Sequence, residues 1–174
     1  MKKFKRQKDK SIKQIIINKM SAIPSIIVPI IEKGKSINKN LFDCLKNKKV
    51  VIFGVPGAFT PTCSEKHLPG FLKLSEAIKA KGVDEIYCLS VNDAFVMSSW
   101  LLSYTDGDKI NGIADGNGEV STLLNVSSDK SANFMGIRCT RFAMIIDDNC
   151  INNIFIEEAG KLEVSSAENI LKEL

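Results

Sequence analysis

Three residues suited to redox chemistry stand together in one predicted turn. Pro56, Thr60 and Cys63 follow a short apolar run at 49–53 in the spacing P-x-x-x-T-x-x-C, and a helical pattern begins directly after them. A cysteine at the start of a helix faces unpaired backbone N–H groups and the positive end of the helix dipole, and both favour its thiolate. Because the thiolate is the nucleophilic form of cysteine, we predict that Cys63 attacks an electrophile such as a peroxide oxygen.

The sequence offers two starting points for this helix. Thr60 can cap it with Pro61 in the first helical position, or Thr62 can cap it in a capping box with Glu65. Cys63 falls in the first helical turn in both cases.

Reduction of a peroxide also needs groups that orient the substrate and stabilise charge on the leaving oxygen. We predict that Thr60 supplies a hydroxyl donor, and that Pro56 keeps the turn rigid and shields the sulfur without adding an N–H group. A cation is expected nearby. Arg141, at the start of a predicted apolar strand, is the candidate, and Arg138 is its competitor.

His67 is the single histidine of the chain and follows Cys63 by four residues, on the same predicted helix face. This spacing is compatible with a Cys-His pair in which His67 takes the thiol proton. Pro69 and Gly70 disturb the helix directly afterwards, so the interpretation we prefer is that His67 packs or hydrogen-bonds beside the site.

The number and spacing of the cysteines indicate a chain without disulfides or a zinc site. Their number, five, is odd, they form no C-x-x-C pair, and one histidine leaves too few partners for a usual zinc arrangement. We therefore expect free thiols, a reducing compartment and no zinc site. The missing C-x-x-C motif also argues against a disulfide reductase. Packing or surface roles are favoured for Cys88, Cys139 and Cys150.

Length and composition fit one folded domain. The chain has 174 residues, of which 44% are hydrophobic and 25% charged. Its net charge of +4 arises from residues 1–19, which contain eight Lys or Arg and one Asp, so that the remaining residues carry a net −3. We predict a basic, flexible segment at 1–19, a folded domain at 20–174 and no binding of nucleic acid.

Residues 1–19 also bear on the cellular compartment of the protein. No apolar run approaches the ~20 residues of a membrane span, so no membrane insertion is expected. Residues 1–19 suit the remnant of a transit segment for an organelle such as a plastid or apicoplast, and they lack the apolar core of a secretory signal. A disordered tail on a cytoplasmic protein is the alternative.

The elements around the turn form a βαβ unit followed by a hairpin. A helix ending at Lys81 separates the runs 49–53 and 85–91, which are therefore predicted to pair in parallel. A second helix is predicted at 93–104, and a short strand ends at Ala114. The apolar face of that second helix is predicted to include Phe95, Met97, Trp100 and Leu101.

The last third of the chain is predicted to form an antiparallel hairpin and a helix instead of a βαβ unit. Apolar runs at 141–147 and 151–157 predict an antiparallel hairpin, and Ser165 with Glu168 forms a capping box for a C-terminal helix. The apolar side of that helix is formed by Ile170, Leu171 and Leu174. The expected fold is a single α/β domain of thioredoxin-like architecture, with a mixed central sheet flanked by helices.

Three blocks in order, VVIFGVPGAFTPTCSEKHLPGF, LSVNDAFVMSSW and TRFAMIIDD, resemble the type-five peroxiredoxins. The resemblance covers about residues 26–174 and implies a thioredoxin fold with Cys63 as the peroxidatic cysteine. Pro56, Thr60 and Arg141 match the other active-site residues. The resemblance also implies hydroperoxide substrates, no metal or organic cofactor, and a homodimer formed through the faces around the site. Electrons would come from thioredoxin, or from glutathione with or without glutaredoxin.

One departure from the family concerns the second half of the cycle. Animal members carry a resolving cysteine just before the C-terminal helix, where this chain has Val164. A one-cysteine cycle, in which an external thiol captures the Cys63 sulfenic acid, is therefore predicted. Resolution by Cys88, Cys139 or Cys150 is the alternative mechanism, and a redox relay that passes oxidation from Cys63 to a partner protein is the alternative function.

Overall fold

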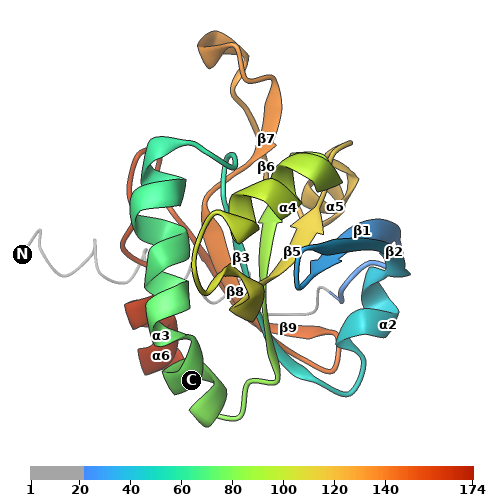
Figure 1. Ribbon diagram of the computed structural model, residues 1–174, viewed down its shortest axis with the longest axis vertical. Helices are drawn as coiled ribbons and strands as arrows, with labels where there is room; N and C mark the ends of the chain where they lie inside the picture. The colour runs from blue at the N-terminus through green and yellow to red at the C-terminus, as the bar shows by residue number, and fades with distance from the viewer. Residues whose placement is uncertain (1–21) are drawn as a thin grey trace, which may run out of the picture.

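A seven-stranded mixed sheet forms the centre of the molecule, with its strands in the order β2-β1-β5-β4-β3-β8-β9 (Figure 1). The computed structural model describes residues 22–174. The strands are β1 (Ile27–Glu32), β2 (Lys35–Asn40), β3 (Lys49–Gly54), β4 (Glu85–Ser90), β5 (Asn111–Ala114), β6 (Ser127–Asp129), β7 (Ile137–Cys139), β8 (Phe142–Asp147) and β9 (Cys150–Ile156). The helices are α2 (Leu41–Leu45), α3 (Leu68–Ala80), α4 (Ala94–Leu102), α5 (Glu119–Leu123) and α6 (Ala167–Glu173), with a π-helical segment η1 (Cys63–His67) and 3₁₀ turns η2 (Gly107–Lys109) and η3 (Ser131–Asn133).

The pairing pattern confirms the predicted βαβ unit and the mixed sheet. Strand β3 pairs in parallel with β4, and β4 with β5, whereas β8 pairs antiparallel with both β3 and β9. The two residues of the predicted hairpin turn between β8 and β9, Asp148 and Asn149, have φ of 44° and 64°, as a primed hairpin turn requires. Strand β3 thus joins the parallel strands β4 and β5 to the antiparallel pair β8 and β9.

Helices cover both faces of the sheet, and successive residues of β3 belong to different cores. Val51 and Phe53 pack with residues of α3, α4 and α6. Val50 and Ile52 pack with residues of α2 and α5. This alternation follows from the two-residue period of a strand, and burial on both faces explains why the run at 49–53 is continuously apolar. The first core is the one to which Cys63 belongs.

Two hairpins were not predicted from the sequence. Strands β1 and β2 pair antiparallel at one edge of the sheet. Strands β6 and β7 form a separate two-stranded sheet that projects from the body at the top of Figure 1. Strand β2 reads KSINKN and is largely exposed, and β6 and β7 are three residues long, so neither pair shows the apolar alternation by which strands are detected.

Two details of the predicted helices are wrong. The C-terminal helix is capped by Ser166, whose Oγ accepts a hydrogen bond from the Asn169 N–H at 3.2 Å, because Ser165 is buried and its hydroxyl bonds to Glu157. Phe95 was expected on the apolar face of α4, but 85% of it is exposed. The other three residues of that face are buried, namely Met97, Trp100 and Leu101.

Between residues 22 and 174, none of the helices has the length and apolar character needed to cross a membrane. The predicted basic segment at 1–19 lies outside the described residues, so the domain boundary at residue 20 stays a prediction.

Candidate active site

The turn that carries Cys63 begins where β3 ends and is fastened to the end of the neighbouring strand β4. The Val55 N–H donates to the Leu89 carbonyl at 2.9 Å, and the Ala58 N–H donates to Asn92 Oδ1 at 2.9 Å. Gly57 lets other groups approach the turn closely, because a Cβ at this position would lie 3.0 Å from Arg138 Nη1. Two backbone N–H groups of the turn are therefore bonded to the end of β4, one to a carbonyl and one to a side chain.

The helix begins at Pro61 after Thr60, which is the first of the two predicted starting points. The Ser64 N–H donates to the Thr60 carbonyl at 2.9 Å, whereas the side chain of Thr62 makes no capping hydrogen bond. The Thr60 hydroxyl itself donates to the Gly57 carbonyl at 2.7 Å. Its proton is therefore committed to the turn, and its oxygen is left to accept a hydrogen bond, which differs from the donor role predicted from the sequence.

The first turns of this helix have π-helical hydrogen bonding. The Leu68 N–H donates to the Cys63 carbonyl, five residues earlier instead of the usual four. Pro69 explains this widening, because proline has no N–H group and its ring would crowd the carbonyl of Glu65, four residues before it. The proline that appeared only to disturb the helix thus sets the local geometry around Cys63.

The widening leaves the Ser64 carbonyl without a backbone donor, since Leu68 bonds elsewhere and Pro69 cannot donate. Two aromatic residues, one in α4 and one just beyond it, bind Ser64 instead. The Tyr104 hydroxyl donates to the Ser64 carbonyl at 2.6 Å, and Trp100 Nε1 donates to the Ser64 hydroxyl at 3.0 Å. Helix α4 and the residues after it therefore clamp the segment next to Cys63.

Arg141 lies against the sulfur. Cys63 is only 1% exposed, and Arg141 Nη2 is 3.5 Å from its Sγ. Arg141 immediately precedes β8, whose first residue Phe142 pairs with Gly54 at the end of β3, so the sheet register brings the guanidinium to the turn. The competing Arg138 has other partners, the carbonyls of Met135 at 2.8 Å and of Pro56 at 3.3 Å.

His67 is buried and both of its ring nitrogens are engaged. Nε2 lies 3.0 Å from the Ser165 carbonyl, which can only accept, and Nδ1 lies 3.1 Å from Arg141 Nη1, which can only donate. These partners fix the neutral Nε2–H tautomer and leave no nitrogen to take a proton from Cys63. The geometry contradicts the Cys-His pair and agrees with the hydrogen-bonding role beside the site.

Burial also keeps this ring neutral. It packs beside the stacked pair of Phe53 and Phe71, with ring centroids at 5.1 and 5.6 Å from its own. Burial, together with the smaller effect of the positive charge of Arg141, lowers the pKa of His67 to about 3 against the opposing effect of the Ser165 carbonyl. His67 is therefore uncharged at neutral pH and serves as an acceptor for Arg141.

All five cysteines are free thiols. Cys88 and Cys139 are fully buried, and burial raises the pKa of each thiol above its ordinary value. Burial raises the pKa of Cys44 as well, whereas Cys150 is exposed on β9. Cys88 and Cys139 thus have the character of packing residues, as predicted. No group of three or more His, Cys, Asp or Glu side chains converges as a metal site within the part of the chain described.

Comparison with known sequences gives a consistent family. A model of the Redoxin family matches residues 21–171. Peroxiredoxin-2B of Arabidopsis thaliana is 50% identical over 127 residues, which are 73% of this chain and 78% of that protein. The chloroplastic peroxiredoxin-2E-2 of Oryza sativa subsp. japonica is 48% identical over 130 residues, 73% of this chain and 58% of that protein.

Solved structures share the fold. Reduced Prx3 of Vibrio vulnificus in complex with H₂O₂ superposes with a TM-score of 0.82 at 40% identity, covering 88% of this chain and 96% of that one. The Plasmodium falciparum antioxidant protein, a 1-Cys peroxiredoxin, gives a TM-score of 0.80 at 32% identity, covering 88% and 95%.

The clamp on Ser64 gives a first prediction. Tyr104→Phe keeps the aromatic ring against Trp100 but leaves the Ser64 carbonyl without its donor, so the free energy of unfolding should fall by about 1–2 kcal/mol. Urea unfolding followed by circular dichroism measures this. Ser99→Ala, at an exposed position of α4, the helix just before Tyr104, should change stability by less than ~0.5 kcal/mol. Equal stability of the two variants would contradict the clamp.

The neutral His67 gives a second prediction. Its folded-state pKa of about 3 lies below the unfolded value of 6.5, so the unfolded chain gains a proton that the folded chain does not. The contribution of the neutral His67 to the free energy of unfolding is therefore fully present above pH 6.5. Below that pH it falls by about 1.4 kcal/mol per pH unit. His67→Gln lacks this titration, so the stability of wild type relative to His67→Gln should drop by about 2 kcal/mol between pH 6.5 and 5. Parallel pH curves for the two proteins would contradict a buried neutral imidazole.

Proposed function

The chain belongs to the Redoxin family and is a type-five peroxiredoxin, a thiol peroxidase, and from this premise we propose that Cys63 is its peroxidatic cysteine. Pro56, Thr60 and Arg141 complete the active site in this proposal. The observation that carries it is the contact between Arg141 Nη2 and the Cys63 sulfur at the start of a helix, since cations and helix N-termini both favour a thiolate.

In the proposed first step, the Cys63 thiolate attacks one oxygen of a hydroperoxide. The O–O bond breaks, the sulfur becomes a sulfenic acid, and the other oxygen leaves as hydroxide or alkoxide and takes up a proton. The guanidinium of Arg141 stabilises the charge that moves from sulfur to the leaving oxygen. The Thr60 oxygen, whose proton is directed to Gly57, accepts a hydrogen bond from the peroxide O–H.

We propose a one-cysteine second half of the cycle. An external thiol such as glutathione condenses with the sulfenic acid, releasing water and leaving a mixed disulfide, and a second thiol then restores Cys63 by exchange. Two observations support this. Position 164 is valine, and burial keeps Cys88 and Cys139 protonated and therefore poor attacking groups. Glutathione with glutaredoxin is the reductant we favour, with thioredoxin as the alternative.

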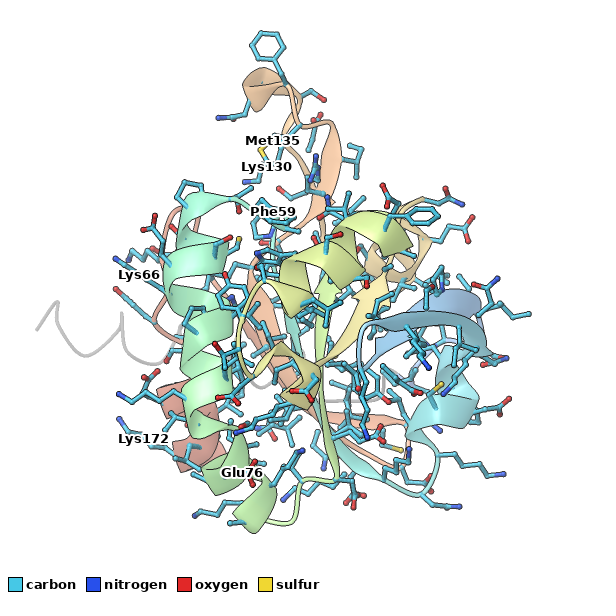
Figure 2. All side chains as sticks on the ribbon, in the orientation of Figure 1. Phe59, Lys66, Glu76, Lys130, Met135 and Lys172 are labelled. Carbon is cyan, nitrogen blue, oxygen red and sulfur yellow. The ribbon has the colours of Figure 1, made fainter. Side chains whose placement is uncertain are left out.

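We propose that the protein works in a plastid as a homodimer. The basic segment at 1–19 and the similarity to a chloroplastic peroxiredoxin support the location. For the dimer, support comes from large apolar side chains exposed in the turn of the site and on the projecting hairpin. Phe59, in the turn itself, is 59% exposed, and Phe134, on the projecting hairpin, is 100% exposed. Figure 2 labels Phe59 and Met135 in the upper part of the view, toward the projecting hairpin.

Intact-mass spectrometry after one equivalent of hydrogen peroxide tests the cycle. We expect one added oxygen without glutathione and one glutathione adduct with it, because Cys63 has no internal partner. The matched control is Cys63→Ser, which should show neither product and should not consume peroxide. A loss of two hydrogens would point to an internal disulfide, and peroxide consumption by Cys63→Ser would overturn the proposed function. A stable adduct without turnover, even with glutaredoxin, would favour the redox relay.

The two arginines provide the test of the cation. Arg141→Met should lower the second-order rate constant for hydrogen peroxide by about 10- to 100-fold, which corresponds to the loss of one hydrogen bond to a charged group. Arg138→Met should change it by less than about threefold, because Arg138 bonds to backbone carbonyls instead of the sulfur. Stopped-flow measurement of peroxide consumption decides between them. The reverse order of effects would assign the role to Arg138.

A further inference from the structure

A buried carboxylate lies at the end of β9, outside the residues that the proposed reaction uses. Glu157 is only 8% exposed, and its Oε1 accepts three hydrogen bonds. The donors are the Glu163 N–H at 2.6 Å, the Ser165 N–H at 2.8 Å and the Ser165 hydroxyl at 2.9 Å. A buried carboxylate is costly unless such donors satisfy it, and hydrogen bonds to an ionised group are about twice as strong as neutral ones. Glu157 therefore fixes the loop 158–166 against the body of the protein.

This loop is connected to the reactive sulfur by a chain of hydrogen bonds. The Ser165 carbonyl accepts from His67 Nε2 at 3.0 Å, and His67 Nδ1 accepts from Arg141 Nη1 at 3.1 Å. The other terminal nitrogen of that guanidinium, Nη2, lies 3.5 Å from the Cys63 sulfur. Glu157 also acts on Arg141 directly, because its backbone N–H donates to the Arg141 carbonyl at 3.0 Å. Both the backbone and the side chain of Arg141 thus depend on Glu157.

We propose that Glu157 is a positioning residue for peroxide reduction: by pinning Ser165 it holds His67 in the Nε2–H tautomer, and His67 in turn holds the Arg141 guanidinium against Cys63. The proposal rests on the proposed function of Cys63 and Arg141. In this proposal the Glu157 carboxylate does not contact the substrate, but it orients the Arg141 guanidinium, which does.

The charge of Glu157 matters here more than its shape. Glutamine has the same length, but its neutral oxygen binds the three donors more weakly, and its NH₂ group adds a donor where donors already converge. A loosened loop lets the Ser165 carbonyl leave Nε2. His67 is then free to exchange tautomers or to take up a proton, and in both cases Nδ1 is lost as the acceptor for Arg141.

Nuclear magnetic resonance reads this network without any peroxide. The chain contains one histidine, so ¹⁵N-histidine labelling of the full chain gives a single pair of imidazole nitrogen signals. In the wild type we expect the Nε2–H pattern, unchanged between pH 5 and 8. In Glu157→Gln we expect mixed tautomers or a protonation midpoint within that range. The matched control is Val164→Ala, in the same loop, because the bonds to Glu157 come from Glu163 and Ser165; it should resemble the wild type.

Single-turnover kinetics tests whether the network reaches the sulfur. Glu157→Gln should react with hydrogen peroxide about 3- to 10-fold more slowly than the wild type at a temperature where both are folded, and Val164→Ala should react at the wild-type rate. A change in the histidine signals together with the slower rate supports the proposal. If either readout stays at its wild-type value in folded Glu157→Gln, the proposal is overturned, because Glu157 then has no effect on Cys63 through His67.

Two further arms keep the test decisive. If Glu157→Gln does not fold, Ser165→Ala removes only the hydroxyl bond to Glu157 and should shift both readouts in the same direction by a smaller amount. Unchanged readouts in that variant would overturn the proposal. A failure of the proposed function is separately visible as peroxide consumption by Cys63→Ser, whereas the histidine signals report the network whether or not Cys63 reacts.

Discussion

The thiolate proposed for Cys63 would be almost fully buried and would need positive or hydrogen-bonding groups around it, and most features of this site can be understood from that requirement. Cys63 is 1% exposed, and the guanidinium of Arg141 lies 3.5 Å from its sulfur. A guanidinium at this place needs acceptors of its own. His67, kept neutral by burial, supplies one, and its other nitrogen is satisfied by the Ser165 carbonyl. The contacts of Arg141 and His67 thus join three segments that are far apart in the sequence.

The local sequence around Cys63 gives the second constraint. Pro69 removes one N–H group from the helix, the turn widens, and the Ser64 carbonyl must find a donor outside the helix. Tyr104 provides that donor and Trp100 binds the Ser64 hydroxyl, so the segment beside Cys63 is attached to the region of α4 as well as to α3. A single residue type at one position therefore decides how the reactive segment is joined to the rest of the core.

The sequence predicts the parts of this structure that depend on local patterns. The run at 49–53, the helix that carries Cys63 and the hairpin of β8 and β9 follow from apolar periodicity and turn residues, and the structure contains all three, with the helix starting at the first of the two predicted positions. The polar strand β2 and the short hairpin β6–β7 carry no such pattern. Ser165 was misassigned as a helix cap because its hydroxyl is taken by Glu157, a contact between residues that only the folded chain brings together. The hydrogen bond from Tyr104 to Ser64 joins residues forty positions apart. The only indication of it in the sequence is Pro69, which has no N–H group to donate to the Ser64 carbonyl.

The two halves of the proposed cycle place opposite demands on this arrangement. Attack on a small peroxide benefits from a buried sulfur, because low local polarity strengthens the interaction of Arg141 with the developing charge. Capture of the sulfenic acid by an external thiol needs the sulfur to be reached by a much larger molecule, and at 1% exposure it is not. Some segment around Cys63 must therefore move between the two steps. The loop pinned by Glu157 and the segment clamped by Tyr104 and Trp100 both resist such movement, so the contacts that orient Arg141 for the first step add to the free energy that the second step has to overcome.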